Sequence, residues 1–199
     1  MKIAILILAA GSSTRMGLAK QLLPVGKTTL LGITIEHAQQ SNADKVYCIL
    51  GANAETIEQS IKKHNVEILN NTNYKTGLSS SIVKGVKHIT QLNFNSVLIL
   101  LGDQPHVTSD YLNDMINTHK IHSEKIIASH YNKTLGVPTI IPRVHFKELL
   151  KLQGDKGAKA FLNSKKQELI QLENANFHDI DTKEDYQDFL KSINLNKNL

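Results

Sequence analysis

The chain opens on an apolar run that breaks directly into a loop of small, hydroxyl-bearing and basic side chains. Residues 3–10 are isoleucine, leucine and alanine only, and Gly11, Ser12, Arg15 and Lys20 follow within the next ten positions. A continuously apolar run of this length is typical of a strand that is covered on both faces, as in the parallel sheets of α/β proteins. The stretch therefore predicts a buried strand that ends in a loop able to bind an anion.

Apolar strand-like runs alternate with amphipathic segments along the rest of the chain. Strands are predicted at residues 3–10, 45–50, 66–69, 96–101, 125–129 and 168–172, with an extended segment at 137–142. Helices are predicted after Thr28 or Thr29, after Thr108 or Ser109, and over residues 54–64, 78–89, 144–152, 157–163 and 182–193. Residues 132–136 are predicted to form a turn, and the hydroxyls of Ser79, Ser80 and Ser81 to cap the helix that begins at residue 78. This alternation predicts a three-layer α/β/α fold with a mostly parallel sheet.

Length and composition favour one folded domain. With 199 residues, 41% of them hydrophobic, the chain can bury one substantial core, and we expect a single domain over residues 1–193 with a frayed tail at 194–199. Residues 3–10 are too few to span a bilayer, which needs about 20 apolar residues. The single cysteine, Cys48, excludes an internal disulfide and favours a reducing compartment. We therefore expect a cytoplasmic protein with no membrane partner.

The charge of the chain suits an anionic small molecule better than a nucleic acid. The formal net charge is +5, which favours anionic ligands in general. However, the lysines are scattered at helical spacings, and no basic tract interleaves with aromatic side chains as a single-strand binder would require. A nucleotide is therefore expected as a ligand, and a nucleic acid is not.

Two common nucleotide-binding motifs do not fit the opening loop. A Walker A loop that ends at residues 26–28 would need a glycine where Gln21 stands. A dinucleotide fingerprint would need glycines where Ser13 and Met16 stand. What remains is a loop of small residues whose backbone can approach phosphate oxygens, together with one arginine and one lysine that supply positive charge.

A lone carboxylate follows another buried run. Asp103 comes just after residues 96–101, and the carboxyl ends of parallel strands meet at one edge of the sheet, so we expect it near the opening loop. A carboxylate there could bind Mg²⁺, although it could also be a turn or helix-capping residue. Asp179 and Asp181 are candidates for a second ligand, with Asp181 equally placed to begin the last predicted helix.

Residues 8–20 resemble the signature of the nucleotidyltransferases related to the molybdenum cofactor enzymes, and other segments resemble the molybdopterin cytidylyltransferase-like branch of that family. These segments are residues 71–85 (nucleotide-pocket loop), 101–107 (metal-binding turn), 136–138 and 152–162 (acceptor side), and 179–186 (closing motif). The resemblance implies a Rossmann-like sheet of the nucleotide-diphospho-sugar transferase type. It also implies an enzyme that couples a nucleoside triphosphate to a phosphorylated acceptor and releases pyrophosphate.

The resemblance implies roles for individual residues. The catalytic residues would be Arg15, Lys20 and Asp103. The nucleotide would be bound by Leu8, Ala9, Ala10, Gly11, Ser12, Arg15, Lys20, Asn73, Gly77, Ser79, Ser80 and Gly102. Mg²⁺ would be bound by Asp103 and Asp181, and the acceptor by Gln104, Pro105, Gly136, Pro138, Gly154 and Asp155.

The resemblance also implies CTP as the nucleotide, Mg²⁺ as the cofactor and molybdopterin or molybdenum cofactor as the acceptor. Ala10 matches the cytidylyl branch, whereas the guanylyl branch tends to have glycine there. Val137 and Lys159 depart from the histidine and arginine that are frequent in the family, and these departures concern the acceptor. The alternatives are a guanylyl-, sugar-phosphate or isoprenoid-phosphate nucleotidyltransferase, and a non-catalytic nucleotide-binding accessory protein. A molybdoenzyme or accessory protein is the kind of protein partner implied.

Overall fold

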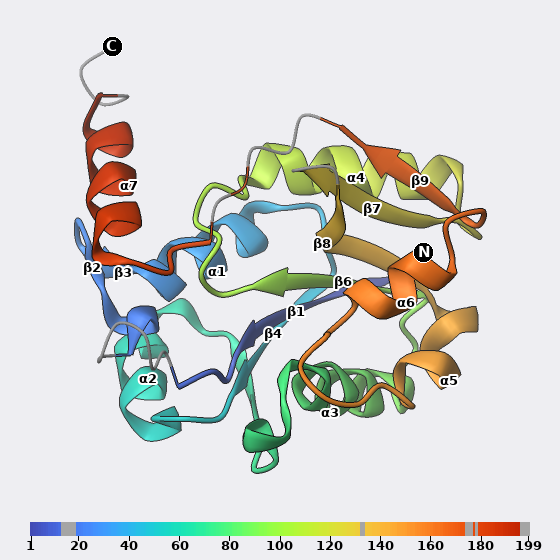
Figure 1. Ribbon diagram of the computed structural model, residues 1–199, viewed down its shortest axis with the longest axis horizontal. Coiled ribbons are helices and arrows are strands. Elements are labelled where there is room, and N and C mark those ends of the chain that lie inside the picture. Colours follow the sequence, from blue (N-terminus) through green and yellow to red (C-terminus); the bar gives the residue numbers. More distant parts are fainter. Residues whose placement is uncertain (13–18, 132–133, 174–176, 178, 196–199) are drawn as a thin grey trace.

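Seven strands form one sheet in the computed structural model, which describes residues 1–12, 19–131, 134–173, 177 and 179–195 (Figure 1). In sheet order the strands are β5 (Glu67–Asn70), β4 (Lys45–Leu50), β1 (Ile3–Ala9), β6 (Ser96–Leu101), β8 (Thr134–Pro142), β7 (Ile126–Tyr131) and β9 (Leu169–Leu172). All neighbouring strands pair in parallel except β8, which is antiparallel to both β6 and β7. The predicted mostly parallel α/β sheet is therefore confirmed.

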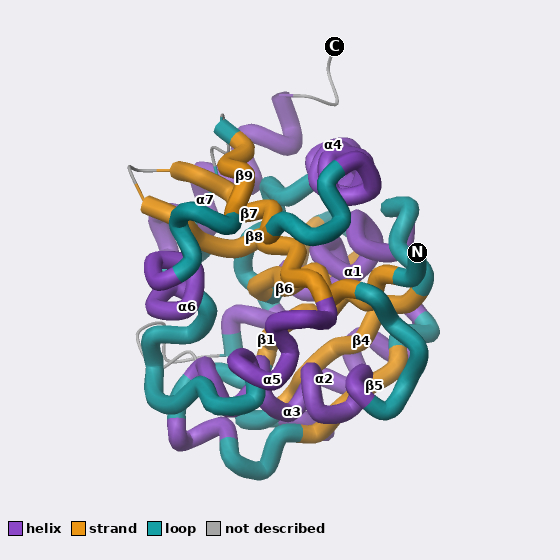
Figure 2. Tube along the Cα trace, turned by 90° about the vertical axis from the view of Figure 1, so that its right-hand side faces the viewer, coloured by secondary structure: helices purple, strands orange, loops and turns teal. Residues whose placement is uncertain are grey.

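Helices cover both faces of this sheet (Figure 2). The helices are α1 (Leu30–Gln40), α2 (Ala54–Ile61), α3 (Leu78–Thr90), α4 (Ser109–Ile121), α5 (Phe146–Leu149), α6 (Lys159–Ser164) and α7 (Lys183–Leu195). Alternate side chains of β1 point to opposite faces: Ile3, Ile5 and Ile7 pack with α1, α2 and α4, whereas Ala4, Leu6 and Leu8 pack with α3, α5 and α6. The first apolar run is therefore buried on both sides, as its composition predicts.

A short hairpin and the last helix form an addition beside the sheet. Strands β2 (Pro24–Val25) and β3 (Thr28–Thr29) pair in antiparallel fashion around Gly26, which adopts a positive φ of 59°. Helix α7 packs on this hairpin through a cluster that includes Leu23 and Phe189 (Figure 1). The sequence predicts only a helix interruption at Pro24, because two-residue strands leave no hydrophobic period to detect.

The predicted turn at residues 132–136 is wrong for its second half. Residues 132–133 lie outside the described ranges, but Thr134 already begins β8 and pairs with Tyr131, and Gly136 pairs with Ser129. The glycine is a turn signal in the sequence, yet here it allows close packing, because a Cβ at Gly136 would lie 2.8 Å from the Tyr131 hydroxyl oxygen.

The remaining elements match their predictions, with differences at the ends. Thr29 and Thr108 cap α1 and α4 by accepting hydrogen bonds from the backbone N–H groups of Gly32 and Tyr111. Helix α7 continues to Leu195, beyond the predicted end, while the remaining tail residues 196–199 lie outside the described ranges. None of the described helices is both long enough and apolar enough to span a membrane. The single-domain organisation over residues 1–193 stays a prediction.

Candidate active site

A cavity of about 820 Å³ lies at the carboxyl ends of β1 and β6. It is lined by Leu8, Ala9, Ala10, Gly11, Ser12, Lys20, Gln21, Tyr74, Lys75, Gly77, Leu78, Ser81, Leu101, Gly102, Asp103, Asp155, Asp179 and Asp181. The lining combines the loop after β1, the start of α3, the turn after β6 and the segment before α7. Residues that are far apart in the sequence thus meet at one edge of the sheet, where ligands of open α/β sheets bind.

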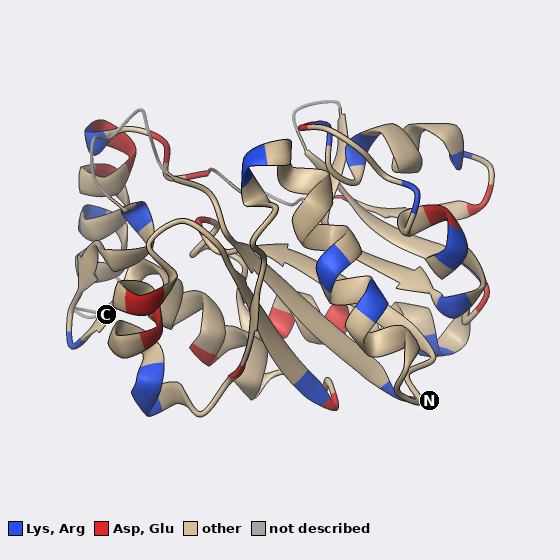
Figure 3. Cartoon of the chain, turned by 90° about the horizontal axis from the view of Figure 1, so that it is seen from below, with Lys and Arg blue, Asp and Glu red and all other residues tan. Residues whose placement is uncertain are grey.

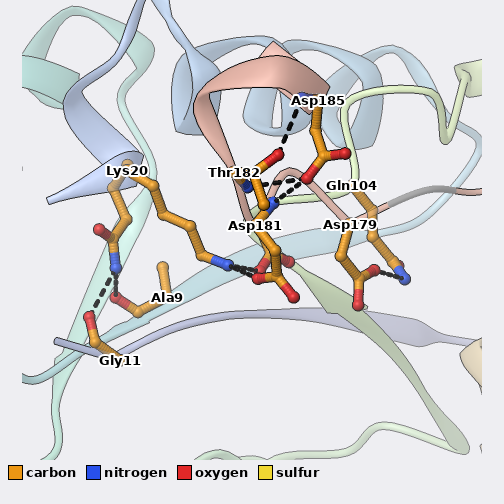
Figure 4. Close-up of polar contacts among 10 residues, drawn as sticks. Ala9, Gly11, Lys20, Gln104, Asp179, Asp181, Thr182 and Asp185 are labelled. Carbon is orange, nitrogen blue, oxygen red and sulfur yellow. Dashed lines mark hydrogen bonds and ion pairs between the residues drawn. The ribbon is translucent and has the colours of Figure 1, made fainter. Parts of the chain in front are cut away.

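The loop after β1 is held by a buried glutamine. Gln21 is 4% exposed, and its Nε2 donates hydrogen bonds to the carbonyl oxygens of Ala9 at 3.1 Å and Gly11 at 2.9 Å (Figure 4). The backbone N–H of Ala52 donates to the carbonyl oxygen of Ala10 at 3.1 Å. The carbonyl groups of three successive residues, Ala9, Ala10 and Gly11, therefore accept hydrogen bonds from within the protein. The residue that breaks the Walker A pattern thus holds the end of β1 and the first residues of the loop that follows it.

Lys20 joins two carboxylates across the cavity (Figure 4). Its Nζ lies 2.5 Å from Asp103 Oδ2 and 2.9 Å from Asp181 Oδ1. Burial disfavours the charged ammonium, but the charges and hydrogen bonds of the two aspartates outweigh this effect and raise the pKa of Lys20 above its ordinary value. Lys20 therefore stays protonated at neutral pH and is positioned at the centre of the site.

The segment before α7 fixes Asp181. Asp185 Oδ2 accepts hydrogen bonds from the backbone N–H groups of Asp181 at 3.1 Å and Thr182 at 2.7 Å (Figure 4). In return, Thr182 Oγ1 accepts from the backbone N–H of Asp185 at 3.1 Å, which completes a capping box. The backbone N–H of Ile180 also donates to the carbonyl oxygen of Asp103 at 3.0 Å. Asp181 thus lies at a helix start and in the cavity, so the two interpretations of its sequence are compatible.

Asp179 lies beside this pair with a different partner. The Nε2 of the fully buried Gln104 donates a hydrogen bond to Asp179 Oδ1 at 2.8 Å. Burial and the neighbouring charge of Asp103 raise the pKa of the Asp179 carboxyl, whereas the hydrogen bond from Gln104 lowers it. Between the two candidates for the second carboxylate, Asp181 is the one that shares Lys20 with Asp103.

The start of α3 presents a different set of side chains from the one predicted. Gly77, predicted to bind the nucleotide, lines the first cavity, but Asn73 and Ser80 line a second cavity on the other side of this helix. Ser79 is buried, and its Oγ donates a hydrogen bond to the carbonyl oxygen of Gln153 at 3.2 Å. Consequently, three of the predicted nucleotide-binding residues lie outside the first cavity.

The prediction that serine hydroxyls cap α3 is also wrong. Gly77 occupies the N-cap position and makes no side-chain hydrogen bond. Ser80 Oγ donates to the carbonyl oxygen of Gly77 at 2.8 Å, and Ser81 Oγ accepts from Asn71 Nδ2 at 3.1 Å. These hydroxyls therefore connect the helix to its neighbours, whereas a cap would have accepted from backbone N–H groups.

The predicted acceptor residues are dispersed. Asp155 lines the first cavity and Gly154 lines the second. Pro105 and Pro138 are buried and line neither cavity, and Gly136 packs against Tyr131. The predicted phosphate ligand Arg15 lies outside the described residues.

Several lining residues were missed from the sequence. Six lining residues were not named individually, although all but Gln21 lie in segments assigned to the site: Gln21, Tyr74, Lys75, Leu78, Ser81 and Leu101. Helical periodicity offers a signal for two of them, because Leu78 and Ser81 are three residues apart and share one face of α3, while Ser80 lies on another. Gln21 offers no such signal, since its role depends on the path of the backbone.

Gly77 allows α3 to begin against the segment at Asp155. Its φ of 107° is strained for other residues, and a Cβ there would lie 2.5 Å from Asp155 Oδ1 and from the carbonyl oxygen of Gly154. We expect Gly77→Ala to reduce the free energy of unfolding by about 1–3 kcal/mol, measured by urea denaturation. Gly11→Ala is the control, because its Cβ would meet nothing within 4 Å. Equal stability of the two variants would contradict this close approach.

The charge of the cavity bears on which ligands it can hold. Its described lining carries the carboxylates of Asp103, Asp155, Asp179 and Asp181 and the ammonium groups of Lys20 and Lys75. An anion entering this acidic surface would be repelled unless a cation accompanied it.

The carboxylates also bear on whether a metal fits. Asp103 Oδ1 is buried and has no hydrogen-bond partner within the described residues. Among those residues no three His, Cys, Asp or Glu side chains are already arranged as a metal site. Asp103 and Asp181, which converge on one ammonium group, could supply two oxygen ligands to a divalent metal, and the bound molecule would have to supply the others.

The protein has the nucleotide-diphospho-sugar transferase fold, with a mostly parallel sheet. Lysine and carboxylate side chains surround a cavity at the carboxyl edge of this sheet, which is the arrangement of a nucleotide-binding α/β protein. Residues 5–170 match the family model described as the MobA-like NTP transferase domain. The chain belongs to this family of nucleotidyltransferases, which confirms the resemblance found in the sequence.

Relatives of known sequence or structure agree with this assignment. The chain is 25% identical over 192 residues to the purine catabolism protein PucB of Bacillus subtilis, covering 90% of this chain and 91% of PucB. It is 30% identical over 132 residues to the bifunctional protein GlmU of Gloeothece citriformis, covering 64% of this chain but only 29% of GlmU. The structure of Rv0371c from Mycobacterium tuberculosis in complex with manganese is 27% identical, with a TM-score of 0.80 and coverage of 96% and 100%.

Proposed function

We propose that the protein is a Mg²⁺-dependent cytidylyltransferase that transfers a cytidylyl group from CTP to the phosphate of a molybdopterin-type acceptor and releases pyrophosphate. The observation that carries this proposal is the convergence of Lys20, Asp103 and Asp181 beside the loop after β1. Such an arrangement places a fixed cation and metal-binding oxygens next to a backbone loop suited to phosphate groups.

The reaction requires positioning more than covalent chemistry. An oxygen of the acceptor phosphate attacks the α-phosphorus, the bond from that phosphorus to the bridging oxygen breaks, and pyrophosphate leaves with the bond electrons. A phosphate monoester has a second pKa of about 6, so it is largely ionised at neutral pH and needs no general base. The loop after β1, with Lys20, would hold the triphosphate, and Arg15 stays a predicted phosphate ligand.

Asp103 and Asp181 would hold the metal. When bound, Mg²⁺ supplies charge neutralisation at the phosphate oxygens. The manganese complex of the relative Rv0371c supports a divalent metal, and the acidic lining of the cavity supports it independently. Lys20 would then exchange its two carboxylate partners for phosphate oxygens, because its ammonium group lies where the two aspartates converge.

The preference for CTP over GTP would depend on the room beside Ala10. A Cβ on Gly51 would lie 2.9 Å from the Ala10 Cβ and 2.6 Å from the Tyr74 Cβ, so Gly51 packs closely behind two residues that line the cavity. The Ala10 methyl group leaves less room for a purine than a glycine would. We expect CTP to outcompete GTP in pyrophosphate release, and Ala10→Gly to shift the ratio of kcat/KM values toward GTP by about tenfold. A wild-type preference for GTP would overturn the choice of nucleotide.

The acceptor is tested by pyrophosphate release with a panel of phosphorylated compounds. A molybdopterin-type acceptor should support turnover, whereas N-acetylhexosamine and isoprenoid-type phosphates should not. Turnover with sugar phosphates alone would replace our proposal by the sugar-phosphate alternative; the chain spans less than a third of the relative GlmU. Binding of CTP without turnover on any acceptor would instead support a nucleotide-binding accessory protein.

A further inference from the structure

A second cavity, of about 830 Å³, lies on the other side of the start of α3. It is lined by Leu69, Asn70, Asn71, Thr72, Asn73, Thr76, Ser80, Val83, Lys84, Lys87, His88, Gln91, Leu150, Leu152, Gln153 and Gly154. Amide, hydroxyl and basic side chains dominate this lining, and among its described members no side chain is acidic. The two cavities of this protein therefore differ in charge, since carboxylates outnumber the lysines that line the first.

The positive charge of the second cavity comes from one face of α3. Lys84 and Lys87 are three residues apart and exposed. Figure 3 shows in blue where Lys and Arg residues lie on the helices of this side of the molecule. Within the described part of the chain neither lysine forms an ion pair. The imidazole of His88 lies beside a carboxylate, with its Nε2 3.4 Å from Glu67 Oε1. Two lysine charges therefore remain available to an anionic ligand.

The two cavities share a wall. Asn71, which is 4% exposed, donates from Nδ2 to Ser80 Oγ at 2.8 Å and to Ser81 Oγ at 3.1 Å. Ser80 lines the second cavity and Ser81 lines the first, so one buried side chain contacts both linings. The segment that follows α5 makes another connection, because Gly154 lines the second cavity and the adjacent Asp155 lines the first.

The same segment is bonded to the start of α3. The backbone N–H of Ser79 donates to the carbonyl oxygen of Gly154 at 3.1 Å, and Ser79 Oγ donates to that of Gln153 at 3.2 Å. A displacement of residues 153–154 by a ligand would therefore move the helix start and Asp155 together. These hydrogen bonds connect the two linings physically. A ligand in either cavity could therefore change the geometry of the other cavity.

We propose that the second cavity binds a small phosphorylated ligand and that its occupancy is transmitted to the proposed nucleotide site. Lys84 and Lys87 would hold the phosphate group, and the amides of Asn73 and Gln153 would hold its hydroxyl groups. Binding in the second cavity does not depend on the proposed reaction, whereas the identity of the first cavity as a nucleotide site rests on the proposed function.

Binding is tested by titrating the ¹⁵N-labelled protein with ribose 5-phosphate and following backbone amide signals. Saturable shifts are expected at Asn73, Lys84 and Lys87, whereas ribose alone should produce none. The double variant Lys84→Gln, Lys87→Gln should weaken this binding at least tenfold. A double variant with the same charge change at the exposed Lys62 and Lys120, Lys62→Gln, Lys120→Gln, should stay within twofold of wild type.

The same titration tests the shared wall. Ser81 and Asp155 line the first cavity, and their backbone amide signals should shift with the same saturation curve as that of Lys84. These shifts should disappear in the Lys84→Gln, Lys87→Gln variant. Shifts confined to the first cavity, or equal binding by both double variants, would overturn the second site. Shifts at Lys84 that never reach Ser81 and Asp155 would overturn the coupling. Neither outcome depends on whether the protein turns over CTP.

Discussion

Replacing Lys20 by methionine should lower kcat/KM for pyrophosphate release by about 10³-fold, because a fixed cation at the transferred phosphate is lost. The same change should strengthen the binding of Mn²⁺ to the nucleotide-free protein, since the ammonium group that lies 2.5 Å from Asp103 and 2.9 Å from Asp181 is removed. Steady-state kinetics and isothermal titration with Mn²⁺ measure the two effects. A fall in kcat/KM together with a rise in Mn²⁺ affinity would indicate that the lysine occupies the place of the metal in the nucleotide-free protein.

Lys27→Met is the matched control for this experiment. Lys27 is exposed and lies in the hairpin turn between β2 and β3, so its removal should change neither turnover nor metal affinity. If Lys20→Met retained turnover within tenfold of wild type, Lys20 would not be a phosphate ligand. If its affinity for Mn²⁺ were unchanged, the metal would not bind between Asp103 and Asp181.

Asp103→Asn should also lower turnover by at least about 10³-fold while the protein remains folded. The substitution keeps the shape of the side chain, but it removes the charge that faces Lys20. It also replaces one of the two carboxylate oxygens, Oδ1 or Oδ2, with an NH2 group. Because Lys20 retains Asp181, the thermal midpoint should change by no more than a few degrees. Pyrophosphate release and a thermal melt on the same sample separate loss of function from loss of fold.

A graded series makes this prediction sharper. The Asp181 side chain is 41% exposed against 19% for Asp103, so water can replace more of its contribution, and Asp181→Asn should cost only about 10–100-fold. Asp110→Asn, at the exposed start of α4, should leave turnover unchanged. An Asp103→Asn variant that turns over CTP normally would remove Asp103 from the proposed metal site.

The central strands of the sheet could be predicted because helices cover them on both faces. The residue bounds of β4 and β6 match the prediction at both ends, since apolar runs covered on both faces leave a strong signal. The hairpin of β2 and β3 was missed because its strands are two residues long. The start of β8 was missed because Gly136 provides space for Tyr131, and a sequence does not distinguish this use of glycine from a turn.

The charged centre of the candidate site could be predicted, because Asp103 lies just past a buried strand and because Lys20 and Asp181 lie in segments that match the family motifs. Lys20, Asp103 and Asp181 were all chosen from the sequence, and the structure brings them together in ion pairs. Ser80 was misplaced because a motif match gives residues without their orientation, and one position along α3 is enough to turn a side chain from one cavity to the other. Gln21 could not have been chosen, since it contacts backbone atoms, whose positions depend on the fold.

The position of β1 in the sheet has a consequence for synthesis of the protein. This strand precedes both of its neighbours in the chain, since β4 and β6 begin at Lys45 and Ser96. Until they are made, seven apolar residues have two unpaired backbone edges, and such a segment readily pairs with another chain. Nascent chains that stop before Leu101 should therefore aggregate or recruit chaperones, whereas chains that include β6 can pair β1 on both sides.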